Sequence, residues 1–192
     1  MNYRAITATM LVTALLVSCA PANELVRGTY AGTSQVQTSL GLSMDVQTVE
    51  ASANDVRGAP LIVGSSPLEN IRFNRADQKT MADSLESELL RLHVFSGSAN
   101  SEAGNAAKLT MKYNITNYLP QPFPEYRISF TIKLVAPNMA PFEKDYAINS
   151  LDGLSASQKW NINAPRSKLR AEEQALAKVI PDLEAYLSRY SN

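Results

Sequence analysis

Two side chains are candidates for chemistry because each is the sole member of its type. Cys19 is the only thiol and His93 the only imidazole. One cysteine cannot form an internal disulfide, and together the two cannot supply the usual ligands of a zinc site. His93 follows the apolar end of a predicted helix, where histidine commonly caps or packs. There is also no phosphate-binding Gly-rich loop and no Gly-x-Ser-x-Gly turn. We therefore expect no catalytic residue, metal or cofactor.

The chain before Cys19 has the composition of an export signal. Arg4 is the only charge before Glu24, and Ala5–Val17 is an unbroken run of apolar residues and threonines. The run fits a secretory h-region and is shorter than the roughly 20 apolar residues of a membrane-spanning helix. It leads into Leu16-Val17-Ser18-Cys19, which resembles the lipobox of bacterial lipoproteins. The alternative is an ordinary signal peptide with a chance cysteine near its cleavage site.

The lipobox resemblance implies that residues 1–18 are a signal peptide cleaved before Cys19. The thiol would then carry diacylglycerol, and the new amino terminus would carry a fatty acid such as palmitate. Each buried methylene contributes about 0.8 kcal/mol, so two or more chains form a lasting anchor. Ala20, not Asp, follows the cysteine. By the sorting rule of enteric bacteria this favours the outer membrane, and we expect the protein to face the periplasm.

The charge balance excludes one class of partner and removes one way of holding a membrane. The chain carries 18 Lys and Arg against 18 Asp and Glu, a net charge of zero. Nucleic-acid binding needs a concentrated basic surface, so we expect no nucleic-acid partner. Removal of residues 1–18 takes away only one charged side chain, that of Arg4. The mature chain then has no electrostatic attraction to an anionic membrane, and the acyl chains must hold it.

The body after the signal reads as a tether followed by one domain. Residues 19–34 have few large apolar side chains and include Pro21, Gly28 and Gly32. They predict a flexible tether that would span roughly 20 Å. Residues 35–192 show no repeat and no second core, and we interpret them as a single periplasmic domain.

Alternation of apolar and polar residues predicts the strands. The candidate segments are 36–48, 61–63, 109–116, 128–134 and 142–149. We expect Gly41 to bend the first segment or turn it into a hairpin, and we expect Ile71 and Phe73 to extend the sheet. In the third segment the buried face is predicted to carry Leu109, Met111, Tyr113 and Ile115. The small polar segment Ser96–Ala107 is predicted to be a mobile loop.

Helical spacing predicts two amphipathic helices. The first covers 74–93, with Asn74 as N-cap and Asp77 near its positive end. Its carboxylates Asp83, Glu86 and Glu88 are expected on a solvated face. The second has an apolar seam from Leu169 to Tyr190, accepts Pro165 in its first turn, and bends without breaking at Pro181. The fold class is therefore α+β, with a mostly antiparallel sheet of four to five strands and both helices on one face.

Aromatic residues around a proline-rich hairpin form the first candidate partner surface. Leu119–Tyr126 reads LPQPFPEY, and Tyr118, Phe123 and Tyr126 stand around its three prolines. Rigid apolar loops lose little entropy on docking. The alternative is that Phe123 folds back onto the edge of the sheet.

Cations before the last helix form a second candidate surface. Arg166, Lys168 and Arg170 precede Ala171, and cations are unfavourable at a helix amino end. Either the helix begins nearer Ala171, or these charges serve an acidic partner or a lipid headgroup. Trp160, in the polar stretch before this helix, is a third candidate.

The layout as a whole resembles a broad group of small outer-membrane lipoproteins. The group includes the lipopolysaccharide-assembly lipoprotein, YajG-type proteins, and lipoproteins with a TolB-amino-terminal-like or transport-auxiliary domain. The resemblance rests on the lipobox, the helix Met81–Leu92, the strand entry Asn105–Leu109 and Val26-Arg27-Gly28-Thr29 after Cys19. It implies a non-enzymatic helper protein, since a shared fold alone does not define an activity.

Three functions follow as hypotheses. The leading one is a lipid-anchored accessory subunit that holds a protein partner in an envelope assembly or transport complex. The alternative is a periplasmic lipid or glycolipid binding module with an apolar groove between the last helix and the sheet. A hydrolase is disfavoured because the sequence shows no nucleophile, base and acid set.

Overall fold

The computed structural model describes residues 27–50, 72–100, 104–119 and 122–190. Its elements run in the order β1 (Gly41–Gln47), α1 (Arg75–Arg91), β2 (Gly97–Ser98), β3 (Ala106–Leu119), β4 (Glu125–Val135), β5 (Phe142–Asn149), α2 (Ala156–Asn161) and α3 (Ala164–Leu187). Cys19, the signal peptide, the tether up to residue 26 and the predicted strand Leu61–Val63 lie outside the described residues.

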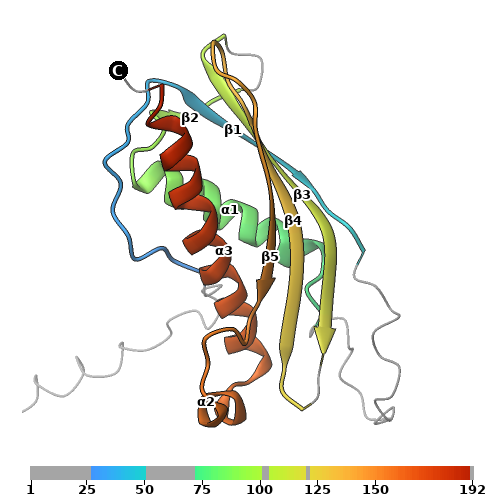
Figure 1. Ribbon diagram of the computed structural model, residues 1–192. Helices are drawn as coiled ribbons and strands as arrows, with labels where there is room; N and C mark the ends of the chain where they lie inside the picture. The colour runs from blue at the N-terminus through green and yellow to red at the C-terminus, as the bar shows by residue number, and fades with distance from the viewer. Residues whose placement is uncertain (1–26, 51–71, 101–103, 120–121, 191–192) are drawn as a thin grey trace, which may run out of the picture.

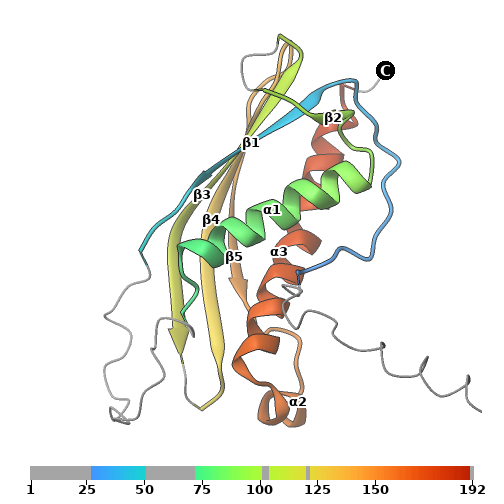
Figure 2. The same cartoon turned by 180° about the vertical axis from the view of Figure 1, so that it is seen from behind.

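The elements form a five-stranded sheet with α1 and α3 on one face (Figures 1 and 2). The strand order is β2-β1-β3-β4-β5. β3, β4 and β5 are antiparallel neighbours, whereas β1 lies parallel to both β2 and β3. The α+β class is confirmed, but the sheet is mixed. Its parallel part arises because α1 carries the chain across the sheet between β1 and β3, the kind of connection that parallel strands require.

The first strand is shorter than its sequence pattern predicts. It begins at Gly41, and Gly41 neither bends it nor starts a hairpin. A Cβ at Gly41 would lie 2.4 Å from the Cβ of Ala99, so the close approach of the segment after β2 explains this glycine. The preceding residues bond to the 94–96 segment, through Thr38 N to Val94 O at 3.1 Å. The predicted loop Ser96–Ala107 accordingly contains β2.

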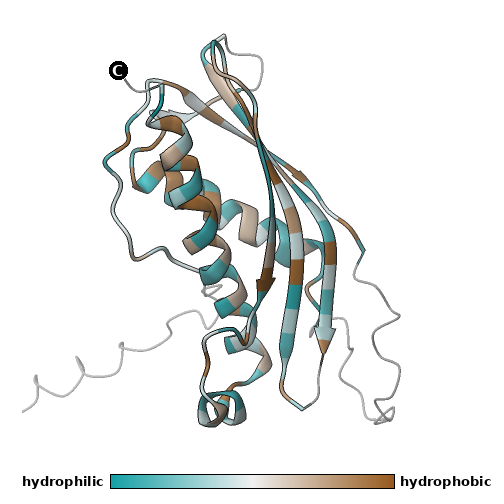
Figure 3. Ribbon diagram, viewed as in Figure 1, coloured by the Kyte–Doolittle hydropathy of each residue, from teal (hydrophilic) through white to brown (hydrophobic). Residues whose placement is uncertain are grey.

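A β-bulge changes which face of β3 is buried. Leu109, Met111 and Tyr113 are buried as predicted, but the register with β4 shifts between Tyr113 and Ile115. After this shift Thr116 is buried and Ile115 is 52% exposed. The prediction of a buried Ile115 was therefore wrong, because one extra residue in a bulge moves every later side chain to the opposite face. Figure 3 shows the alternation of hydropathy along the strands.

The first helix, α1, has the N-cap that its sequence predicts. Asn74 and Asp77 form a capping box, and the backbone of His93 adopts the left-handed conformation (φ 57°) just after the C-cap Leu92. Phe73, before the cap, is a buried core residue and not part of a strand. Glu88 departs from the expected solvated face, since it is 8% exposed and pairs with Arg91 at 2.6 Å.

The last helix is continuous through Pro181 and begins at Ala164, not near Ala171. Asn163 caps it by accepting a hydrogen bond from Arg166 N at 3.0 Å. Its inner face fills the space above β4 and β5 with fully buried side chains. These are Ala171, Ala175, Leu176, Val179, Ile180 and Leu183. Phe130 and Tyr146 meet them from the sheet, with ring centroids 5.5 Å apart.

The start of the described chain is packed onto the helices. Gly28 is buried, and its amide donates to the Glu172 carboxylate of α3 at 3.0 Å. A Cβ at Gly28 would lie 2.7 Å from the Cβ of Glu172. Arg91 of α1 also donates to the carbonyl of Tyr30 at 3.0 Å. Gly28 and Tyr30, which lie within the predicted tether 19–34, are therefore held against the helices.

Candidate partner-binding site

The structure brings together two aromatic residues that lie far apart in sequence. Phe123 lies in the connection between β3 and β4, and Trp160 lies on the short helix α2, at the lower end of the molecule in Figure 1. Their ring centroids are 4.9 Å apart at an interplanar angle of 87°, an edge-to-face contact. Trp160 is 73% exposed, whereas Phe123 is half-buried. Phe123 thus packs against the indole of Trp160.

The local sequence holds α2 at the surface. Ser155 and Gln158 form a capping box at its start, and none of its residues is buried. Asn161 Nδ2 donates to Ser157 O at 2.9 Å at its end. A helix this short gains little from its own hydrogen bonds, so the caps fix its position. Trp160 is therefore presented on an ordered turn.

A buried chain of hydroxyls fixes the 122–126 segment relative to α3. Tyr126 N donates to Ser150 Oγ at 2.9 Å, the Ser150 and Ser167 hydroxyls lie 2.7 Å apart, and Ser167 Oγ donates to Pro124 O at 2.6 Å. An amide can only donate and a carbonyl can only accept, so Ser150 must donate to Ser167. Both serines are fully buried. This Ser150–Ser167 chain places Phe123 beside the α2–α3 corner.

The two tyrosines predicted beside Phe123 face inward to different degrees. Tyr126 is fully buried, and its ring packs on Phe73 at 6.2 Å and on Tyr118 at 4.9 Å. Burial raises the pKa of both the Tyr118 and the Tyr126 hydroxyl. Tyr118 is half-buried. The expectation that the Tyr126 ring lies on a partner surface is therefore wrong, because the alternation of β4 turns it into the core.

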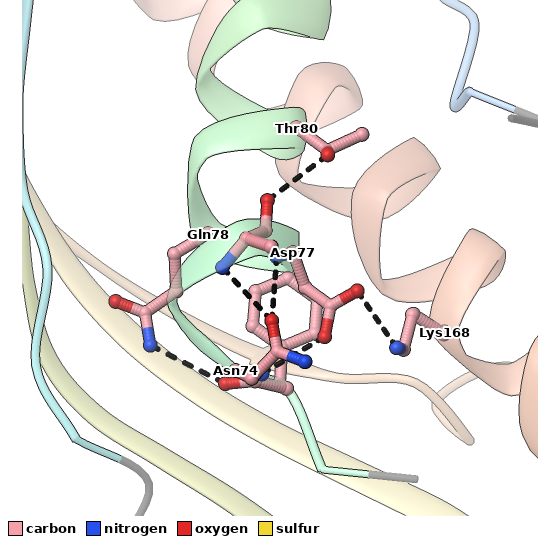
Figure 4. A network of polar contacts seen from close by, with 7 residues as sticks. Asn74, Asp77, Gln78, Thr80 and Lys168 are labelled. Carbon is pink, nitrogen blue, oxygen red and sulfur yellow. Dashed lines mark hydrogen bonds and ion pairs between the residues drawn. The ribbon is translucent and has the colours of Figure 1, made fainter. Parts of the chain in front are cut away.

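Two of the three predicted cations are engaged inside the fold. Lys168 Nζ pairs with Asp77 Oδ1 at 2.8 Å, both side chains being 20% exposed. The other oxygen of Asp77 accepts from Asn74 N, so this carboxylate caps α1 and ties it to α3 (Figure 4). Arg170 donates to the carbonyls of Ser150 and Asp152 at 3.1 and 3.0 Å. Contacts within the domain therefore explain why Lys168 and Arg170 lie at the start of α3, and no binding partner is needed to explain these two cations.

Arg166 is the exposed member of the set, and it borders a cleft. The cleft has a volume of about 300 Å³ and lies between α2 and the start of α3. It is lined by Leu154, Ser157, Gln158, Asn161, Ile162, Arg166 and Arg170. The sequence indicated Trp160, Phe123 and Arg166 separately. It gave no signal for the cleft, because Leu154 and Ile162 belong to no periodic pattern.

The described part of the chain holds no group of three or more His, Cys, Asp or Glu side chains that could bind a metal ion. Within the same ranges, no helix combines the length and apolarity needed to cross a bilayer. His93 is exposed and directly follows the C-cap Leu92 of α1.

The likeness of this chain to known proteins lies in its fold. No protein-family model and no curated protein matches the sequence. Protein XCC0632 from Xanthomonas campestris, described as a DUF330 protein, aligns over 86% of this chain and 95% of its own with 15% identity and a TM-score of 0.51. A minor lipoprotein from Acinetobacter baumannii aligns over 78% and 93% with 13% identity and a TM-score of 0.35. The chain is thus similar in fold to the DUF330 protein XCC0632.

Proposed function

We propose that this protein is a non-enzymatic lipoprotein of the bacterial cell envelope. Cys19 would carry the acyl chains that hold it in the outer membrane, with the domain in the periplasm. Its role would be that of an accessory subunit that holds a protein partner in an assembly or transport complex. The lipobox-like Leu16–Cys19 supports the anchor, and the fold shared with XCC0632 is compatible with it.

The single observation that carries the partner role is the exposed Trp160 on Phe123. A large aromatic side chain left 73% exposed keeps apolar area in water unless something covers it. Tryptophan is enriched among residues that dominate binding energy at protein interfaces. The capped α2 and the Ser150–Ser167 chain hold the pair in place, which lowers the entropy lost on docking.

Copurification tests the partner role. The full-length protein with a C-terminal affinity tag is expressed in its own bacterium and isolated in mild detergent, and bound proteins are quantified by mass spectrometry. Trp160→Ala and Phe123→Ala should each lower the yield of the partner at least tenfold. Val135→Ala, which trims another exposed apolar residue (44%), is the matched control and should leave the yield unchanged. Equal partner yields from all four proteins would reject this assignment.

The anchor has its own test. Mass spectrometry of the mature amino-terminal peptide should show Cys19 as its first residue, carrying diacylglycerol and a fatty acid. An unmodified Cys19, or cleavage elsewhere, would contradict the lipoprotein proposal without touching the partner surface.

The alternative role in lipid or glycolipid binding has weaker support. Core side chains of α3 and the sheet pack against one another in the space between them. A cleft of about 510 Å³ lies instead at the far end of α3, where Leu40, Met139, Leu187 and Tyr190 share its walls with Gln37, Thr38 and Asn138. No lysine or arginine is among its lining residues, and these are the side chains that recognise phosphate-bearing headgroups.

A further inference from the structure

The cleft between α2 and α3 combines an apolar wall with guanidinium groups. Leu154 and Ile162 are both half-buried and supply the apolar part. Arg166 and Arg170 supply the charge, and the remaining lining side chains are neutral. Trp160 lies on α2, the helix that lines the cleft through Ser157, Gln158 and Asn161, so the aromatic pair and the cleft share this helix.

The two arginines differ in how they are held. Arg170 is fixed by its hydrogen bonds to Ser150 O and Asp152 O, which use two of the five donors of its guanidinium. Arg166 is exposed, and within the described residues its guanidinium has no ion pair. It lies in the first turn of a 24-residue helix that has no acidic residue there. The helix dipole disfavours a cation at this end, and a bound carboxylate would offset that cost.

We propose that the partner inserts a segment with an aspartate or glutamate next to an apolar residue into this cleft. Its carboxylate would pair with Arg166, and its apolar side chain would cover Leu154 and Ile162 beside Trp160. Guanidinium recognises carboxylates through two parallel hydrogen bonds, which gives direction as well as charge. The inference rests on the proposed function, because it names the chemistry of the partner at the same surface.

The shape of the site favours a peptide over an anionic membrane surface. A single side chain enters a concave cleft of about 300 Å³, whereas a flat bilayer surface cannot follow its walls. Arg170 is also turned onto backbone carbonyls of its own chain and does not splay outward as a headgroup contact would.

Photo-crosslinking from within the cleft tests the proposal. The photoreactive residue p-benzoylphenylalanine replaces Ser157, an exposed lining residue, in the full-length lipidated protein in its own bacterium. After irradiation, the crosslinked peptide is sequenced by mass spectrometry. We expect a protein peptide with an aspartate or glutamate within about three residues of the crosslink. Arg166→Gln should lower the crosslink yield at least tenfold. Lys79→Gln removes an exposed cation from α1 and should change the yield by less than a third.

Each other outcome overturns the proposal. These outcomes are a crosslink to phospholipid, a peptide without acidic residues, a yield that Arg166→Gln leaves unchanged, and no crosslink at all. Equal thermal unfolding of the Arg166→Gln and Lys79→Gln proteins excludes misfolding as the cause of a loss. If Trp160→Ala abolishes copurification while Arg166→Gln does not affect the crosslink, the proposed function stands and the acidic-segment inference fails.

Discussion

Replacing Ser167 with alanine removes the centre of the hydroxyl chain that positions the candidate site. Ser167 is fully buried on α3, donates to Pro124 O at 2.6 Å and accepts from the Ser150 hydroxyl at 2.7 Å. The variant leaves the Ser150 hydroxyl as a buried donor without its partner. It also frees the Pro124 carbonyl, which is only half-buried and can recruit water.

The expected cost follows from these two groups. An orphaned buried donor costs about 1–3 kcal/mol, and the lost bond to the half-buried carbonyl costs about 0.5–1.5 kcal/mol. The higher helix propensity of alanine offsets about 0.5 kcal/mol of this loss in stability. The free energy of unfolding should therefore fall by about 2 kcal/mol. With a urea m-value of about 2 kcal/mol/M, the midpoint should drop by about 1 M.

Urea unfolding followed by circular dichroism measures this change. Ser87→Ala is the matched control, because Ser87 is an exposed serine on α1, and its replacement should change stability by about 0.5 kcal/mol or less. The double variant Ser150→Ala, Ser167→Ala should cost about 1 kcal/mol less than the sum of the single variants, since the orphaned hydroxyl is then gone. A Ser167→Ala midpoint equal to that of Ser87→Ala would refute the reasoning about this chain.

Three further predictions concern the packing of Gly28, the buried carboxylate of Glu172 and the bulge in β3. Gly28→Ala should lower the unfolding free energy by about 1–3 kcal/mol in urea titrations, because its Cβ would collide with Glu172, whereas Gly97→Ala has open space and should be near neutral. Burial raises the pKa of Glu172, partly offset by the Gly28 amide, so its ionisation opposes folding as pH rises above about 4.5. Glu172→Gln should therefore gain stability relative to wild type from pH 4.5 towards 7, and a parallel pair of stability curves would contradict this. Ile115→Ala should cost less than about 1 kcal/mol in denaturant unfolding, whereas Ile132→Ala should cost about 2–5 kcal/mol; equal losses would mean that the bulge does not expose Ile115.

Much of the fold could be predicted because its signals are local. The α1 cap at Asn74 and the apolar faces of α3, β3 and β4 depend on residues near one another in sequence. The parallel placement of β1 could not be predicted in this way. Alternation shows that a strand has a buried face, but it does not say which neighbour the strand pairs with or in which direction.

The candidate site was likewise predicted only in part from the sequence. Residue types alone marked Phe123, Trp160 and Arg166 as unusual, and burial then separated them from Tyr126 and Lys168. The bulge in β3 had no signal in the pattern, because Asn114 and Ile115 continue the alternation without a break.

The sequence by itself determined the α+β class and the positions of the main strands and helices, because each depends on composition or on spacing over a few residues. It also predicts an export signal that ends at the lone Cys19. Tertiary structure alone decided that Gly28 donates a hydrogen bond to Glu172, that Phe123 contacts Trp160, and that Arg166 borders a cleft with α2. These contacts join segments that lie far apart in the chain. Their geometry is set by how α3 packs on the sheet and by the buried Ser150–Ser167 chain, neither of which has a local pattern.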